Sequence, residues 1–390
     1  MIKIAIITTH PIQYNAPFFK ELAKSKKVQP KVFYTWGASV LQSKYDPAFQ
    51  RNIEWDIPLL DGYEYEFLEN TAKRKGSHHY RGIINPSILE KIKAWKPDAL
   101  LIYGWKFHSH LRVMRYFKGR IPVWFRGDST LLDERPGAAS WVKKILLQWV
   151  YSHIDGAYYT GSNNKSYFRT YGLAGSQLVK AFHAVDNSRF QNTGNRYSSA
   201  AQEWKERLKI PAGNIVFLYA GKVEPKKGIE TLLLAFGNLR NPNAHLLIAG
   251  DGPLQNLLTE KYGALKRVQF IDFQNQQAMP VLYQLCDVFV LPSIGPGESW
   301  GLSLNEAMAA GKTVIASDRC GGAIDLIENN RNGFIFEAGN ANDLLQKMQQ
   351  VMQSKELLPE SGINSLEKIQ QFNFQQFVEA LENMPEKNGR

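Results

Sequence analysis

The sequence has little that could cross-link it, anchor it in a membrane or hold a metal ion. Its 390 residues include two cysteines, Cys286 and Cys320, whose spacing and apolar or glycine-rich surroundings suit neither a disulfide nor a zinc site, so we expect buried thiols. No apolar run reaches the roughly eighteen residues of a membrane-spanning helix. No Asp-x-Asp sequence occurs that could clamp a metal ion. The chain enters its first strand without a signal-peptide pattern, and we therefore expect a cytoplasmic protein.

Acidic residues are the minority among the charged ones, and this imbalance points to an anionic partner. There are 36 Asp and Glu against 47 Lys and Arg, which gives a formal net charge of +11. Nucleic acid fits poorly because no recognition module is present. A phosphate-bearing substrate, an anionic membrane surface and a merely lysine-rich surface remain open.

Strand-like apolar runs alternate with helical patterns along the chain, which predicts an α/β protein with parallel sheets and crossover helices. The polar stretch 191–203 is typical of a linker, so we expect two doubly wound domains, 1–190 and 204–370, with a cleft between them. The phenylalanines of the last helix, within 371–390, would let it pack back on the first domain. The expected strands are 2–8, 32–35, 99–103, 123–126 and 156–160, then 215–220, 245–249, 268–271, 288–291 and 313–316.

Two glutamates flank one strand-to-helix junction in the second half of the chain. Glu298 lies in a glycine-flanked loop after the expected strand 288–291, and Glu306 follows within a helix, with seven residues between the two glutamates. Open α/β sheets bind ligands at the carboxyl ends of their strands, where the first amides of the following helices also point. The junction therefore predicts a site for a polar, anionic ligand that carries hydroxyl groups.

A basic loop follows the strand 215–220. It runs from Gly221 to Gly228 and contains Lys222 and Lys227, which could reach a diphosphate; an ordinary solvated turn is the alternative. The turn 250–253 is expected to be structural. The glycine pair 321–322 would allow close approach of the backbone.

Taken together, these motifs resemble the C-terminal domain of family-4 glycosyltransferases (glycosyl transferases group 1), which are retaining enzymes of the GT-B fold. The resemblance is dense from about 215 to 336 and thinner in the first domain. It implies two Rossmann-like domains that face a deep interdomain cleft. The motifs that carry it are, in order, Lys222, Lys227, 250–253, 291–293, Glu298, Glu306 to Gly311 and Gly321-Gly322.

The resemblance implies a division of roles around a nucleotide-diphosphate sugar, with no metal or other cofactor. Glu298 would bind the hydroxyls of the donor sugar and Glu306 those of the ribose. Lys222 and Lys227 would neutralise the diphosphate, although the family usually has arginine at the first position and lysine lacks its bidentate fork. The further donor-binding residues, which would act through their backbone, are Gly221, Trp300, Gly301 and Leu302.

The first domain departs from the family pattern in two loops. The first loop lacks the usual glycine pair and places His10, Gln13 and Tyr14 after the first strand, where we expect them on the acceptor side; simple packing is the alternative for His10. After the strand 123–126 the family's histidine is replaced by Arg126 and, two residues on, Asp128. Arg126 is a candidate for binding phosphate or sugar, and Asp128 for binding the acceptor or holding Arg126.

Several surface segments suit contact with sugars or lipids. The aromatic, irregular stretch 36–63 could bind an acceptor or cover the core. The segment 108–120 has basic residues at helical spacing beside apolar ones, and with the basic segment 73–81 it is compatible with contact to an anionic membrane. The helix 141–150 is also amphipathic, but its place before a strand favours packing in the core.

These observations predict a retaining, hexosyltransferase-type enzyme that moves a sugar from a nucleotide sugar to a glycan or lipid-linked acceptor. The expected setting is the synthesis of a cell-surface polysaccharide or glycolipid at the inner face of the membrane. Two alternatives remain: a sugar-nucleotide epimerase on the same fold, and a non-catalytic member that only binds the nucleotide sugar.

Overall fold

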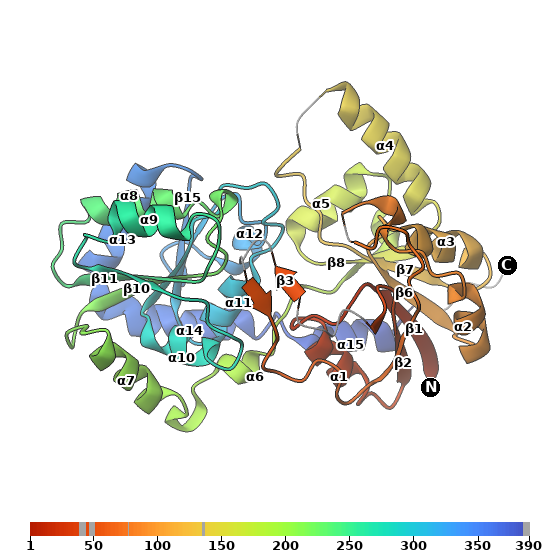
Figure 1. Ribbon diagram of the computed structural model, residues 1–390, viewed down its shortest axis with the longest axis horizontal. Helices are drawn as coiled ribbons and strands as arrows, with labels where there is room; N and C mark the ends of the chain where they lie inside the picture. The colour runs from red at the N-terminus through yellow and green to blue at the C-terminus, as the bar shows by residue number, and fades with distance from the viewer. Residues whose placement is uncertain (39–43, 47–50, 77, 135–136, 385–390) are drawn as a thin grey trace. The chain divides into compact units, whose positions relative to one another are not determined.

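The computed structural model describes residues 1–38, 44–46, 51–76, 78–134 and 137–384 (Figure 1). The chain forms two compact units. The first consists of residues 1–43, 58–183 and 374–390, and the second of residues 44–57 and 184–373.

The first unit is built on a parallel, doubly wound sheet with the strand order β5-β2-β1-β6-β7-β8-β9. Strands β2 and β5 lie on one side of β1, and β6 to β9 lie on the other. The switch point of the sheet is therefore between β1 and β6. The strands are β1 (Ile2–Thr8), β2 (Val28–Tyr34), β5 (Glu64–Phe67), β6 (Ala99–Tyr103), β7 (Val123–Arg126), β8 (Gly156–Tyr159) and β9 (Leu178–Lys180).

Apolar layers cover both faces of this sheet because side chains alternate along each strand. Ala5 and Ile7 of β1 face one core, whereas Ile4 and Ile6 face the other. The helices of this unit are α1 (Ala16–Leu22), α2 (Ile88–Trp95), α3 (His108–Phe117), α4 (Ala138–Tyr151), α5 (Ser162–Thr170) and α15 (Phe374–Glu382), with the short 3-10 turns η2 (Tyr80–Gly82) and η3 (Gly175–Gln177).

The last helix, α15, completes the core of the first unit. Its Phe377, Val378 and Leu381 are buried. The ring of Phe377 stacks on Phe18 of α1 with centroids 4.4 Å apart. The carbonyl of Ala380 accepts a hydrogen bond from the Tyr158 hydroxyl at 3.3 Å. The first unit therefore combines the two ends of the chain in one hydrophobic layer.

Replacing Phe377 by alanine is expected to lower the free energy of unfolding by about 3–5 kcal/mol, because it removes a buried aromatic ring and leaves a cavity. A urea titration followed by circular dichroism measures the change. Gln375→Ala, at an exposed position of the same helix, is the control and should lie within about 0.5 kcal/mol of the parent. Equal effects of the two substitutions would contradict the assigned role of α15.

The second unit is also built on a parallel sheet, with the order β12-β11-β10-β13-β14-β15 and a switch point between β10 and β13. Its strands are β10 (Ile215–Ala220), β11 (Ala244–Ala249), β12 (Val268–Ile271), β13 (Val288–Leu291), β14 (Thr313–Ser317) and β15 (Gly333–Phe336). Its helices are α6 (Asn187–Phe190), α7 (Ser198–Arg207), α8 (Ile229–Asn238), α9 (Gln255–Tyr262), α10 (Met279–Leu285), α11 (Leu302–Ala309), α12 (Ala323–Leu326), α13 (Ala341–Gln353) and α14 (Leu358–Ile369). The 3-10 turns are η4 (Thr193–Asn195), η5 (Pro225–Lys227) and η6 (Lys355–Leu357).

A short segment from the first half of the chain belongs to the second unit. Residues 44–57 contain the antiparallel pair β3 (Lys44–Asp46) and β4 (Arg51–Ile53). Asp56 accepts from the backbone N–H of Gln277 at 3.1 Å and, through its carbonyl, from the Gln277 side chain at 2.5 Å. The predicted irregular stretch 36–63 is thus divided between the units, although its residues 39–43 and 47–50 lie outside the described part of the chain.

The unit boundary differs from the expected one. The chain passes into the second unit between His183 and Ala184, and the stretch 191–203 contains η4 and the start of α7 rather than a linker. Ala201 is the buried residue of α7, so most of this helix faces solvent. Its polar composition is therefore that of an exposed helix. Cys286 and Cys320 are both free and buried, as predicted.

Candidate active site

The loops that follow β10 and β13 leave the sheet of the second unit at its switch point. Strands β10 and β13 are parallel neighbours at the middle of the sheet. Strand β11 lies beside β10 on one side of this pair, and β14 lies beside β13 on the other. Open α/β sheets generally bind their ligands at such a switch point, outside the carboxyl ends of the strands. The predicted basic loop and the predicted Glu298 loop both lie at this position.

Lys227 and Glu298 meet between these two loops. The Lys227 ammonium donates to Oε2 of Glu298 at 2.5 Å, and the Ser293 hydroxyl donates to the same oxygen at 2.8 Å. The side chains of Lys227 and Glu298 are 20% and 13% exposed. An ammonium has three N–H groups, so Lys227 can hold Glu298 and still donate to an anionic ligand. Sequence reasoning missed Ser293, which lies five residues before Glu298 in a segment noted only for its family resemblance.

A glycine allows the two loops to approach each other. Gly228 has φ +63°, and a Cβ atom built there would lie 2.1 Å from the carbonyl oxygen of Pro292. The backbone N–H of Ile294 donates to the carbonyl of Lys226 at 2.9 Å. Any larger residue at 228 would separate the loops, and with them Lys227 and Glu298.

The start of α11 is fixed by contacts within the loop that precedes it. Trp300 is buried, and its indole N–H donates to the side chain of Asn305 at 2.7 Å. Gly301 has φ +93°, and a Cβ atom there would lie 2.6 Å from Sγ of Cys320. Helix α11 (Leu302–Ala309) has Gly301 as its N-cap, so the backbone amides of Trp300, Gly301 and Leu302 lie at or just before its first residue.

The glycine pair 321–322 holds this loop from the other side. The N–H of Gly321 donates to the carbonyl of Glu298 at 2.9 Å, and the N–H of Gly322 donates to the carbonyl of Trp300 at 2.8 Å. The close backbone approach expected of these glycines is therefore an approach to the protein's own Glu298 loop.

Glu306 lies farther along α11 and is 3% exposed. Its Oε2 accepts a hydrogen bond from the hydroxyl of Tyr283, on α10, at 2.7 Å. Tyr283 is fully buried and was not recognised in the sequence, where it reads as one of several aromatic core residues. The contact fixes the orientation of the Glu306 carboxyl group.

Gly221 and Lys222 begin the basic loop. The carbonyl of Lys222 accepts from the Tyr219 hydroxyl at 2.7 Å. Burial, followed by the negative charges of Glu298 and Glu224, raises the pKa of Tyr219 well above its usual value, so this hydroxyl remains a donor. A Cβ atom at Gly250 would lie 1.9 Å from the carbonyl oxygen of Gly221, which agrees with a structural role for the turn 250–253.

The candidate residues of the first unit lie in the loops after β1 and β7. His10, Gln13 and Tyr14 are half-buried and follow β1, which borders the switch point of that sheet. Nδ1 of His10 is 2.9 Å from the Thr9 hydroxyl, and the His10 ring meets the edge of Trp36 at 5.2 Å. His10 therefore has packing contacts at a position that also suits ligand binding.

The side chain of Arg126 makes its contacts inside the first unit. It is buried, donates to the carbonyl of Ala181 at 2.7 Å and lies 4.3 Å from the centre of the Phe377 ring. These contacts give Arg126 a structural role within the first unit. Asp128, two residues on, is exposed.

A histidine that the sequence did not single out lies near this pair. Burial, followed by the nearby Arg126 cation, lowers the pKa of His183 to about 3, whereas Asp128 acts in the opposite direction. His183 is consequently neutral at pH 7 and can donate or accept a hydrogen bond through its ring. The signal that could have identified it is its position directly before 184–186, a segment similar to the family's.

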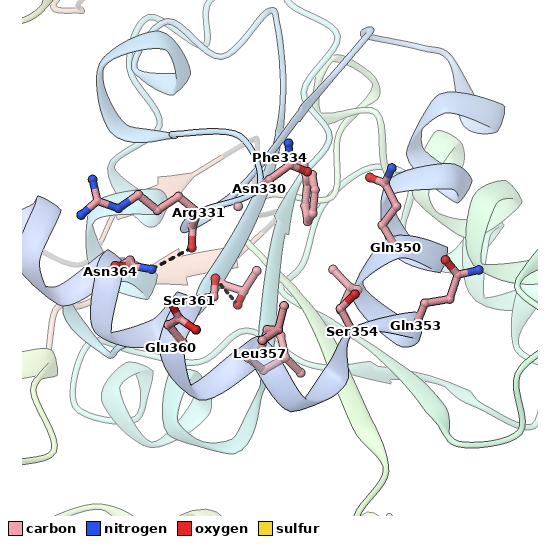
Figure 2. Close-up of a pocket in the computed structure, with 14 residues that line it drawn as sticks. Asn330, Arg331, Phe334, Gln350, Gln353, Ser354, Leu357, Glu360, Ser361 and Asn364 are labelled. Carbon is pink, nitrogen blue, oxygen red and sulfur yellow. Dashed lines mark hydrogen bonds between the residues drawn. The ribbon is translucent and has the colours of Figure 1, made fainter.

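A separate pocket of about 320 Å³ lies elsewhere in the second unit (Figure 2). Its walls come from β14, β15, α13 and α14, and include Gln350, Ser354 and Asn364. Thr313 and Gly333 are the first residues of their strands, so this pocket adjoins the amino ends of β14 and β15, whereas the Glu298 loop follows the carboxyl end of β13. It is distinct from the candidate site.

The described residues contain neither a metal-binding cluster nor a membrane-spanning helix. No group of three or more His, Cys, Asp or Glu side chains is placed to hold a metal ion there. None of the helices in that part of the chain is both long and apolar enough to cross a membrane.

Comparison with known proteins finds a family match in the second unit. Residues 200–367 match the family described as glycosyl transferases group 1. The matched residues all lie within the second unit. Over 159 residues the chain is 33% identical to an uncharacterized glycosyltransferase of Methanocaldococcus jannaschii, in an alignment that spans 38% of the chain and only 40% of that relative. It is 26% identical to spore coat protein SA of Bacillus subtilis over 351 residues, 84% of each chain.

The fold of the chain is GT-B. A solved structure of HepE from Anabaena, in complex with UDP and glucose, superposes with a TM-score of 0.70 at 18% sequence identity. The superposition covers 98% of this chain and 100% of HepE. The predicted architecture of two Rossmann-like, doubly wound domains is confirmed.

Proposed function

We propose that the chain transfers a sugar from a nucleotide-diphosphate sugar to a glycan or lipid-linked acceptor, with retention of configuration. The observation that carries the proposal is the Lys227–Glu298 pair at the switch point of the group 1 domain. The UDP and glucose bound by HepE, which shares the fold, support a nucleotide sugar as the donor. We place the reaction in the synthesis of a cell-surface polysaccharide or glycolipid.

The proposed roles of the site residues follow from the charges that develop on the donor during sugar transfer. Cleavage of the sugar–diphosphate bond builds negative charge on the leaving group while the sugar becomes cationic. Lys227, Lys222 and the first amides of α11 would stabilise that charge, each such donor contributing about 3 kcal/mol. Glu298, held by Lys227 and Ser293, would bind the hydroxyls of the departing sugar. The proposal includes no metal ion or other cofactor.

Glu306 would bind the nucleotide ribose. We expect Glu306→Gln to raise KM for the donor about tenfold and to leave kcat nearly unchanged, because a charge-assisted hydrogen bond made equally in the ground and transition states is weakened. Initial rates at varied donor concentration measure both constants. Tyr283→Phe, which removes the hydroxyl that orients Glu306, should raise KM in the same direction. An unchanged KM in both variants would exclude the ribose role.

The acceptor would be bound by the first unit, through His10, Gln13, Tyr14 and Asp128, with Arg126 as a positioning residue. A lipid-linked acceptor would place the reaction at the inner face of the membrane, where a positively charged protein is attracted to anionic headgroups.

A donor panel tests the proposed function. The protein is incubated with UDP-, GDP- and dTDP-sugars and a membrane lipid extract, and nucleotide release and the glycosylated product are measured. Transfer with at least one donor is the expected result. Interconversion of the nucleotide sugar without a glycosylated product would identify an epimerase, and binding without turnover a non-catalytic family member.

A further inference from the structure

Helix α4 exposes a large apolar surface. Trp141, Val142 and Ile145 are 70%, 68% and 66% exposed, and Leu146 and Trp149 are also exposed. The sequence favoured core packing for this helix, but only Leu147, Val150 and Tyr151 of α4 are buried. The structure therefore corrects that expectation: one side of α4 packs on the unit and the other is apolar without being covered by it. We call the exposed set, Trp141, Val142, Ile145, Leu146 and Trp149, the α4 face.

The α4 face is continuous. Positions 141, 142, 145 and 149 follow each other at intervals of one, three and four residues, which places them on one side of a helix. The buried residues 147, 150 and 151 lie on the opposite side. Figure 1 shows α4 (yellow) at the margin of the first unit, beside α5. A helix that is apolar on both sides is typical of burial within protein or lipid.

Basic groups lie beside the α4 face. The helix contains no acidic residue, and its charged side chains are Lys143 and Lys144. Lys143 pairs with Glu134 at 2.6 Å, whereas Lys144 is exposed. From α3, the guanidinium of Arg115 lies 5.7 Å from the centre of the Trp149 ring. Apolar side chains with a tryptophan toward each end and cations beside them match the interface of an anionic bilayer.

The α4 face is not the membrane-binding surface expected from the sequence, which was the segment 108–120, now seen as α3, together with the segment 73–81. Leu111, Met114 and Phe117 of α3 are buried in the core of the first unit, so this helix has no apolar side left for lipid. Its Arg115 contributes only charge, next to the apolar residues of α4.

We propose that the α4 face inserts into the headgroup region of an anionic lipid bilayer, with the helix parallel to the membrane plane. Fourteen residues of helix span about 21 Å, too short to cross a hydrocarbon core of about 30 Å. The inference deepens the proposed function and rests on it for the acceptor, since a lipid-linked acceptor resides in such a bilayer. The binding itself needs no transfer activity.

Vesicle flotation tests the inference with the full-length protein. The chain should float with vesicles of phosphatidylcholine mixed with phosphatidylglycerol, bind pure phosphatidylcholine more weakly, and bind less as salt is added. The double variant Trp141→Ser, Ile145→Ser should weaken binding to anionic vesicles roughly 30-fold or more. Lys144→Glu should weaken it less and reduce the salt dependence.

Matched controls separate lipid insertion from a general loss of apolar surface. Leu257→Ser and Ile363→Ser remove side chains that are 57% and 56% exposed on the second unit, and should bind vesicles like the parent. Thermal unfolding confirms that all variants fold. Equal weakening by the controls, or no vesicle binding by the parent, would overturn the inference.

Two further measurements, of dimer formation and of turnover, also decide whether the α4 face binds lipid. A dimer that forms without lipid and is lost in Trp141→Ser, Ile145→Ser, with no vesicle binding, would show that a second copy covers the α4 face and would refute the proposal. Turnover of a nucleotide sugar in solution is measured in parallel. A parent protein that turns over a nucleotide sugar but does not bind vesicles would reject only this inference, whereas a parent protein that binds vesicles but shows no turnover would reject only the proposed function.

Discussion

Replacing Lys227 by alanine is expected to lower kcat for sugar transfer roughly 100- to 1,000-fold. The substitution removes a cation at the point where the leaving diphosphate gains charge, and a fixed donor of this kind is worth about 3–4 kcal/mol in the transition state. Because this charge develops during the reaction, kcat should fall more than KM rises. Single-turnover measurement of nucleotide release separates the chemical step from binding.

Lys226 supplies a matched control for this experiment. It is the neighbouring residue of the same loop, but it is exposed and pairs with Glu224 at 3.3 Å, away from Glu298. Lys226→Ala changes the net charge by the same amount and should alter kcat by less than about twofold, since exposed pairs contribute little. Similar losses in both variants would mean that overall charge, and not the position of Lys227, matters.

Glu298→Gln is expected to lower kcat about 100-fold or more. Glutamine preserves the size of the side chain but removes the charge that holds Lys227 at 2.5 Å and Ser293 at 2.8 Å. Both the contact to the sugar and the placement of the lysine are then impaired. The same assay of nucleotide release applies, with Glu224→Gln as the control because that glutamate pairs with Lys226 instead.

The double variant of Lys227 and Glu298 tests whether the two residues act together. Groups in direct contact have effects that do not multiply, so the double variant should be little slower than the worse single variant. A loss equal to the product of the two single effects would show that they act independently.

The sequence predicted the strands beneath the candidate site because their apolar runs are distinct and are followed by Gly- or Pro-containing loops. Strand β10 occurs with the expected bounds, 215–220. Within the two parallel sheets, the strands that were missed are β5, β9 and β15. They have three or four residues and are only partly buried, so they lack a distinct apolar signal. Short edge strands of this kind are defined by pairing with a neighbour, which a local pattern does not contain.

The candidate site could be predicted only in part. Glu298, Lys227 and the start of α11 follow from loops at the ends of strands, a relation that sequence order preserves. Ser293 and Tyr283 became evident only when the folded chain placed their hydroxyls against the two glutamates. The exposure of α4 could not be predicted because its two apolar sides look alike in sequence, and only the tertiary structure decides which is covered.

The position of α15 has a consequence for the order in which the protein can be completed during synthesis. The core of the first unit includes Phe377, Val378 and Leu381, which follow the second unit in the chain. All residues of the second unit, up to Asn373, are translated before them. The first unit, whose counterpart in most multidomain proteins is finished first, must here wait until α15 has been translated. A nascent chain that has already completed its second unit would still expose Phe18 and the surrounding apolar layer to solvent or to chaperones.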